Sequence, residues 1–203
     1  MDVPVVPFGK PRPERADAAR NREHLLRTVR AMIDELGPEN VTMDGLAERA
    51  GLGKGTVFRR FGTRAGIFQA VMHDDELRFQ ESVLFGPPPL GPGAEPGERL
   101  IAYGLARFEM LRTNHAVIRE GLDRSAPTPA TVSMTPPHFR MLLRQVRPSL
   151  PHPEGLALQL SAALEGPFLL YLGTDDLTGP AGEQGCEHLA DSWRTLVERV
   201  LGG

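Results

Sequence analysis

The sequence is poor in cysteine, and Cys186 is its only one. A single thiol excludes an intrachain disulfide and any metal site built from several cysteines, and it favours a lone buried side chain. The sequence also has no uninterrupted run of about 18 apolar residues, the length needed by a membrane-spanning helix. Its most apolar segment, residues 156–172, is interrupted by Gln159, Glu165 and Pro167.

The N-terminus does not resemble a signal peptide. In MDVPVVPFGKPRPER, prolines stand where a signal peptide needs an apolar helical segment. We therefore expect a cytoplasmic protein, and we interpret residues 1–15 as a flexible basic arm.

Motifs of common enzyme classes are missing too. The segment Gly51–Thr56 has the glycines of a phosphate-binding loop, but Lys54 is followed by glycine, and Glu48 occupies the place of the first glycine. The run His73-Asp74-Asp75-Glu76 could supply metal ligands, although adjacent residues diverge around a helix, so we interpret it as a charged helical face. We predict no enzyme activity, no metal and no cofactor.

The charge is unevenly distributed. The formal net charge is −3, whereas residues 10–64 contain twelve Lys and Arg against eight Asp and Glu. A basic N-terminal third on an acidic body fits a phosphate-binding head attached to a domain with another task. Chance clustering of surface charge is the alternative.

Helical periodicity without a convincing alternating pattern predicts an all-α protein. A first helix over residues 16–36 should end at Gly37-Pro38. Two proline-rich segments, 86–97 and 126–137, are predicted loops. Two short helices are predicted to start at Thr42 and near Lys54. The other predicted helices span residues 63–77, 98–114, 116–122, 139–146, 156–172 and 187–201.

Residues 41–61, VTMDGLAERAGLGKGTVFRRF, read as two short helices joined by a glycine turn. Thr42 is a good N-cap for the first of them, and Val41 and Leu46 have the spacing of a hydrophobic staple. In the second, Val57 and Phe61 share one face, which we expect to pack against the helix over residues 16–36.

Gly55 does not lie on that inner face, and a glycine inside a helix costs roughly 1 kcal/mol relative to alanine. It either eases close helix packing or lets the backbone approach a partner. Lys54, Arg59 and Arg60 surround it and form either a solvated face or a set of phosphate clamps for groove entry.

The stretch from about Arg20 to Val71 resembles the DNA-binding domain of TetR-family transcriptional regulators. The resemblance rests on Thr42–Gly51, on Leu52–Phe61, and on Arg64 and Phe68. It implies an N-terminal three-helix, helix-turn-helix domain over residues 16–62. It also implies a C-terminal helical bundle for ligand binding and dimerisation over residues 63–203.

The resemblance further implies a set of DNA contacts. Phe58 and Arg60 stand where the family usually has Tyr and His, so one phosphate-binding hydroxyl is lost, while Arg60 can still donate. Arg12 and Arg15 of the arm either reach the minor groove or belong to a solubilising tail. The implied DNA-binding residues are Thr42, Lys54, Gly55, Thr56, Phe58, Arg59, Arg60 and Arg64.

By the same resemblance, the expected function is that of a ligand-responsive repressor that binds a palindromic operator as a homodimer. Residues 156–172 and 187–201 would form the dimer interface. An all-helical carrier of small molecules without DNA binding is the alternative. Candidate pocket residues for an effector of unknown identity, each also compatible with ordinary core packing, are Tyr103, Arg107, Phe108, Phe139, Met141, Glu165 and Phe168.

Overall fold

A computed structural model describes residues 13–121, 134–171 and 180–202 of the chain. The side chains of residues 13–18, 168–171 and 180–186 are not part of this description. Residues 1–12 of the predicted arm, most of the second predicted loop and the side chain of Cys186 therefore lie outside the described residues.

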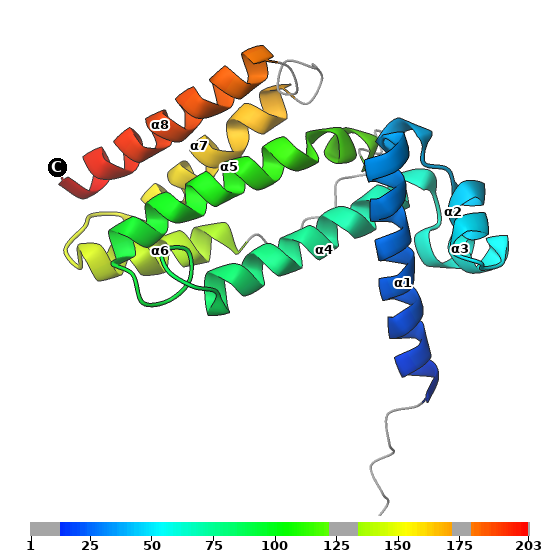
Figure 1. The fold of residues 1–203 in the computed structure, drawn as a ribbon. Coiled ribbons are helices and arrows are strands. Elements are labelled where there is room, and N and C mark those ends of the chain that lie inside the picture. Colours follow the sequence, from blue (N-terminus) through cyan, green and yellow to red (C-terminus); the bar gives the residue numbers. More distant parts are fainter. Residues whose placement is uncertain (1–12, 122–133, 172–179, 203) are drawn as a thin grey trace, which may run out of the picture. The chain divides into compact units, whose positions relative to one another are not determined.

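In these ranges the chain forms helices and no strand, which confirms the predicted all-α fold (Figure 1). The helices of the N-terminal third are short except for the first. The elements are α1 (Pro13–Leu36), η1 (Pro38–Asn40), α2 (Met43–Arg49), α3 (Lys54–Phe61), α4 (Arg64–Phe85), α5 (Pro96–Gly121), α6 (Thr135–Val146), α7 (Pro153–Tyr171) and α8 (Pro180–Gly202).

The chain divides into two compact units, Met1–Val71 and Met72–Gly203. The division falls inside α4, because the first turns of this helix carry side chains that are buried in the first unit. These side chains are Ile67, Phe68 and Val71, each at most 1% exposed.

In the first unit, α1 packs against η1 and α2. Its buried face consists of Leu25, Leu26, Val29 and Met32. The helix ends where predicted, at Gly37, whose φ of 79° is readily available only to glycine. The N-terminal turns of α1 extend past α2 and α3 (Figure 1).

The second unit is a bundle in which α5 packs against α6, α7 and α8, and α6 packs against α7. Its core contains Trp193 of α8, which is 2% exposed and donates from Nε1 to the Ile101 carbonyl oxygen at 3.3 Å. Gly104 makes this contact possible, since a methyl group at that position would overlap the indole ring. The indole of Trp193 therefore joins α8 to α5 by packing directly against Gly104.

Several helices begin earlier than predicted, and most of them begin at a proline. Helix α5 runs without interruption from Pro96, and α6 starts at Thr135, inside a segment predicted as a loop. Proline is accepted in the first turn of a helix, because its missing N–H has no intrahelical partner there. Pro96 and Pro136 therefore mark helix starts, whereas residues 86–95 form the loop that we predicted.

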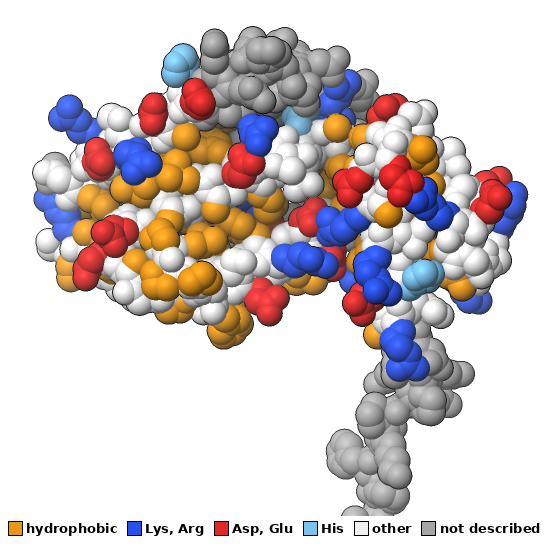
Figure 2. Space-filling model, viewed as in Figure 1, with side chains coloured by type: hydrophobic (Ala, Val, Ile, Leu, Met, Phe, Trp, Pro, Cys, Tyr) orange, Lys and Arg blue, Asp and Glu red, His pale blue; other side chains and the backbone are white. Residues whose placement is uncertain are grey.

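The surfaces of the two units differ in character. On the face shown in Figure 2, hydrophobic side chains gather over α5 in the second unit, while charges of both signs are interspersed over the first. None of the helices in the described ranges has the length and hydropathy needed to cross a membrane.

Candidate nucleic-acid interface

The N-terminus of α2 is capped as predicted. Thr42 has extended backbone angles, and its hydroxyl oxygen accepts a hydrogen bond from the Gly45 N–H at 3.0 Å. Val41 and Leu46 are both fully buried, as the predicted hydrophobic staple requires. The Thr42 cap therefore fixes the start of α2.

A tight turn joins α2 to α3. Gly51 has a φ of 64°, and the Leu52 N–H donates to the Ala47 carbonyl oxygen at 3.0 Å, which closes the end of α2. Helix α3 then packs mainly against α2, with Val57 fully buried. We predicted packing against the first helix, but the main partner of α3 is α2, and Phe61 is only half-buried.

The outer face of α3 is open. Gly55 is exposed, and a Cβ atom there would have no neighbour within 4 Å, so the interpretation as an internal packing glycine fails. Arg59 and Arg60 are exposed and have no hydrogen bond or ion pair with any part of the chain that the structure describes. This face offers two cations beside an accessible backbone.

Lys54 differs from these arginines, since its Nζ forms an ion pair with Asp44 Oδ2 of α2 at 2.8 Å. Both side chains are about two-thirds exposed (68% and 64%). An exposed pair contributes at most about 1 kcal/mol, so a phosphate can compete for Lys54. Asp44 nevertheless brings a negative charge to the same end of α3.

Two further predicted contact residues flank the outer face. Phe58 is 51% exposed, an unusual degree for an aromatic ring, and Thr56 is half-buried. Thr42, although it caps α2, retains its hydroxyl proton for donation to a partner.

Arg64 has a different environment. Its Nε donates to the Val41 carbonyl oxygen at 2.7 Å, and its terminal nitrogen donates to the carbonyls of Pro38 and Glu39 at 2.8 and 3.0 Å. The guanidinium also lies 5.0 Å from the centre of the Phe68 ring. These contacts join the first turn of α4 to the segment before α2, which favours a positioning role over a direct phosphate contact.

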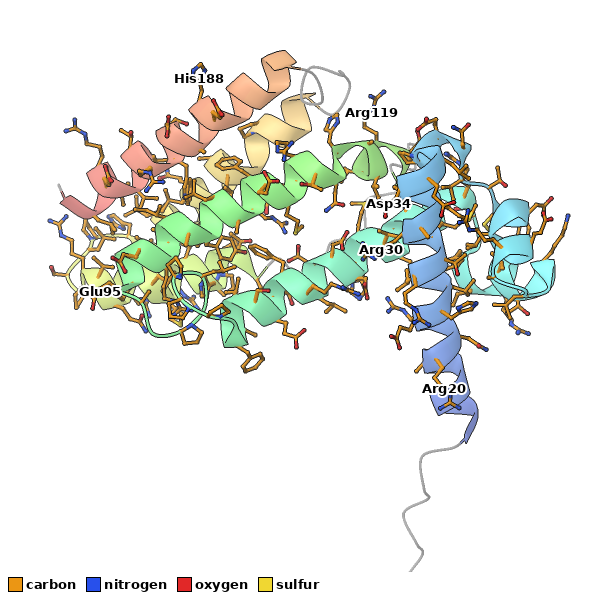
Figure 3. All side chains as sticks on the ribbon, in the orientation of Figure 1. Arg20, Arg30, Asp34, Glu95, Arg119 and His188 are labelled. Atoms are coloured by element: carbon orange, nitrogen blue, oxygen red, sulfur yellow. The ribbon has the colours of Figure 1, made fainter. Side chains whose placement is uncertain are left out.

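Of the arm residues, Arg12 lies outside the described residues, and Arg15 belongs to the first turn of α1. Arg20 follows in the exposed N-terminal part of the same helix, well before Arg30 and Asp34 (Figure 3).

In the second unit, two predicted pocket residues come together. Arg107 of α5 pairs with Glu76 of α4, and its guanidinium lies 3.9 Å from a carboxylate oxygen of Glu165 on α7. The same guanidinium lies 5.4 Å from the centre of the Phe79 ring. This ion cluster links three helices of the bundle.

The other predicted pocket residues are dispersed. Phe108 is 5% exposed and packs edge-on against Trp193, and Phe139 is fully buried and packs against the same ring at a tilt. Both therefore belong to the core rather than to a cavity wall. Met141 is 40% exposed, because it lies on the outer face of α6. The side chain of Phe168 lies outside the described residues.

Tyr103 does line a pocket, together with residues that we did not predict. Its hydroxyl lies 2.7 Å from Thr135 Oγ1, and burial raises the pKa of the phenol. The other lining residues are Phe79, Gln80, Val83, Leu84, Met134 and His138. Four of them belong to the last turns of α4, which we had not predicted to be helical.

The charged run His73–Glu76 lies within α4 and does not form a metal site. Throughout the described ranges, no group of three or more His, Cys, Asp or Glu side chains is arranged to hold a metal ion.

The family model of the bacterial regulatory proteins of the tetR family matches residues 25–71, from the middle of α1 to the first turns of α4. The chain belongs to the TetR family.

Relatives agree with this assignment to the TetR family. The HTH-type transcriptional regulator BetI of Stenotrophomonas maltophilia is 28% identical over 157 residues, which cover 73% of this chain and 79% of that protein. An HTH-type transcriptional regulator of Staphylococcus aureus is 33% identical over 61 residues, a match that covers a third of its own length.

The similarity to TetR-family structures extends well beyond the DNA-binding unit. A TetR-family regulator from Pectobacterium atrosepticum superimposes with a TM-score of 0.70 at 19% identity, covering 92% of this chain and 97% of that one. NalD, the secondary repressor of the MexAB-OprM multidrug efflux pump in Pseudomonas aeruginosa, gives 0.51 at 20% identity, over 87% and 96% of the two chains. SmeT in complex with triclosan gives 0.54 at 20% identity, over 89% and 90%.

The TetR assignment makes this chain a transcriptional regulator. It favours DNA binding over the alternative of a carrier without DNA binding.

Proposed function

We propose that this regulator binds a palindromic operator as a homodimer, inserts α3 into the major groove, and acts as a ligand-responsive repressor. The observation that carries the proposal is the outer face of α3, where Gly55 is open and Arg59 and Arg60 have no internal partner among the described residues. A helix of this kind can approach a groove closely while its cations reach phosphates and base edges.

Each of the other contact residues has a role that fits its environment. Lys54 exchanges Asp44 for a phosphate, and the hydroxyl of Thr42 donates to the backbone while its oxygen keeps the cap on α2. Thr56 and Phe58 meet the groove on either side of Gly55. Arg64 holds α2 in place relative to the start of α4 through its three carbonyl contacts.

Dimerisation is proposed through α7 and α8. Leu158 is 62% exposed, and the exposed residues beside it on α7, Gly155, Ala162 and Ala163, are small enough to allow close helix packing. On α8, Leu196 is 38% exposed, and His188 projects away from the bundle (Figure 3). A two-fold dimer presents two copies of α3, which is why a palindromic operator is expected.

Ligand response is proposed by comparison with NalD and SmeT, whose names identify a repressor and a complex with a small molecule. In this chain α4 supplies residues to both units, from Arg64 in the first to the pocket-lining Leu84 in the second. A ligand that prefers one position of α4 would bias DNA binding, with a typical coupling of about 1–3 kcal/mol.

Selection of DNA from a random duplex pool by the purified full-length protein tests the proposal. We expect a palindrome with half-sites about one helical turn apart, or a small multiple of it. Arg59→Ala should abolish enrichment, whereas Arg144→Ala, which removes an exposed cation of α6, should not. A selected sequence without symmetry, or equal enrichment by Arg59→Ala, would refute the operator model.

A further inference from the structure

An ion pair joins the first turns of α2 and α3. Asp44 Oδ2 of α2 lies 2.8 Å from Nζ of Lys54, the first residue of α3, and the Asp44 side chain is 64% exposed. The two helices pack directly against each other (Figure 1). A carboxylate therefore lies at the N-terminus of the helix that we expect in the major groove.

The fold depends little on this carboxylate. The buried side chains of α2 are those of Leu46 and Ala47, whereas Asp44 is exposed. Asp44 interacts favourably with the N-terminal end of the α2 dipole and with Lys54, but both interactions are weak because the side chain is exposed. Toward DNA the same charge repels phosphates and opposes the attraction exerted by the cations of α3. The charge of Asp44 therefore affects DNA binding more than folding.

On DNA the carboxylate loses its partner. In the proposed function Lys54 leaves Asp44 for a phosphate, and an ionised carboxylate then remains in the interface. Such a carboxylate can only accept hydrogen bonds, and removing it from water without a donor is costly. Binding is then strongest where the DNA offers a donor to Asp44.

The chemistry of the major groove limits the available donors. Among the base edges, only the N4 amino group of cytosine and the N6 amino group of adenine donate there. Adenine carries the N7 acceptor beside its amino group, so it suits an amide, which both donates and accepts, and N7 repels a carboxylate. Cytosine has no such acceptor on its own edge, so a carboxylate favours cytosine.

We propose that Asp44 is a specificity-determining residue, which accepts a hydrogen bond from the N4 amino group of a cytosine in each half-site of the operator. The inference rests on the proposed operator binding and names a base that the operator contains. At other sequences the carboxylate stays unpaired among phosphates. Asp44 thus has two effects, since it selects cytosine and weakens binding to DNA that lacks cytosine at this position.

Exchange of the carboxylate for an amide tests the selection of cytosine. The full-length wild-type protein and Asp44→Asn each select DNA from a random duplex pool. We expect the wild type to select cytosine at one position of each half-site, and replacement of that base pair should weaken its binding roughly 5- to 150-fold. Asp44→Asn should select adenine at that position, because an amide pairs with both N6 and N7, and should keep the other positions.

Affinity for an unrelated duplex measures the second effect. Asp44→Asn removes one negative charge beside the phosphates, so it should raise this affinity up to roughly fivefold. Glu48→Gln is the matched control, because it removes one exposed carboxylate from the same helix. It should leave the preference for cytosine unchanged. Circular dichroism verifies that each variant is folded.

Lys54→Gln separates the role of Asp44 from that of its partner. A lysine can itself donate to the guanine that pairs with the selected cytosine. We expect Lys54→Gln to weaken binding to all sequences, as the loss of a phosphate contact does, and to keep the preference for cytosine. Loss of that preference in Lys54→Gln would overturn the proposal and assign base recognition to Lys54.

The selections also distinguish this inference from the proposed function. If the wild type and Asp44→Asn select the same palindrome with the same base preferences, the inference alone is refuted, and Asp44 only balances the charge of Lys54. If the wild type selects no palindrome, the proposed function is refuted and the inference with it.

Discussion

Arg64 donates from its Nε to the carbonyl oxygen of Val41 across 2.7 Å, and so ties the first turn of α4 to the residue that precedes the N-cap of α2. In the sequence, the same arginine looks like one more cation of the DNA-binding surface. Arg64 differs from Arg60, because Arg64 donates to three backbone carbonyls, whereas Arg60 has no hydrogen bond among the described residues.

This difference gives a paired prediction. Arg64→Ala should destabilise the protein by roughly 2–3 kcal/mol, because three hydrogen bonds from a charged donor are lost, and should leave the salt dependence of DNA binding unchanged. Arg60→Ala should leave stability unchanged and reduce the log–log salt slope by about 1. Urea denaturation and binding titrations at several salt concentrations measure both; a reversed pattern would assign the phosphate contact to Arg64.

Gly55→Glu should abolish operator binding without loss of helicity, since the side chain has room in the free protein but not in a groove. Gly55→Ala is the control for conformation. It should stabilise the protein by roughly 0.5–1 kcal/mol, because alanine favours the helix more than glycine does. DNA-binding assays together with circular dichroism test this, and full operator affinity in Gly55→Glu would exclude close approach at this position.

Phe58→Tyr should raise operator affinity by up to roughly tenfold, because it supplies the hydroxyl that family members usually have at this exposed position. A neutral donor releases no additional counterion, so the salt slope should stay the same. Titration of the selected operator with the wild-type protein and with Phe58→Tyr, at two salt concentrations, measures both the affinity and the salt slope. Unaltered affinity would mean that Phe58 does not face the DNA backbone.

Gly104→Ala should destabilise the second unit by about 1–3 kcal/mol, since the added methyl group meets the indole of Trp193 and strains a well-packed core. Gly202→Ala, at an open position at the end of α8, is the control and should not destabilise the protein. Thermal and urea denaturation compare the two. Equal stability of both variants would show that the core around Trp193 can rearrange to accept a methyl group at position 104.

The lowered pKa of His138 predicts a loss of stability in mild acid. Between the ordinary pKa of 6.5 and the folded value of about 4, the unfolded state binds a proton that the folded state does not. Stability should therefore fall as pH drops through this window, and above it His138 should have no effect.

His138→Leu should remove this part of the pH dependence, as urea denaturation at about pH 7 and about pH 5 would show. His188→Gln, which changes an exposed histidine of α8, should retain the wild-type difference between the two pH values. If His138→Leu keeps the full difference, another group is responsible for it.

Features fixed by neighbours in the sequence could be predicted. Thr42 caps α2 by accepting a hydrogen bond from the N–H three residues later, and Gly37 ends α1 with a positive φ. These arrangements depend on a few consecutive residues, so their signatures are local.

Features that depend on distant residues could not be predicted. The role of Arg64 depends on carbonyls more than twenty positions away, and helical periodicity does not distinguish the wall of a cavity from the core, as Phe139 shows. His138 gave no signal, because it stands between the predicted loop over residues 126–137 and the predicted helix over residues 139–146, whereas in the structure it lies near the start of α6.

The position of Trp193 has an optical consequence. It is the only tryptophan of the chain, and both tyrosines, Tyr103 and Tyr171, also belong to the second unit, so the DNA-binding unit contains neither chromophore. Emission excited selectively in the indole therefore follows the bundle alone. A change in that emission when operator DNA is added would report communication from the DNA-binding unit to the bundle, without a label on either.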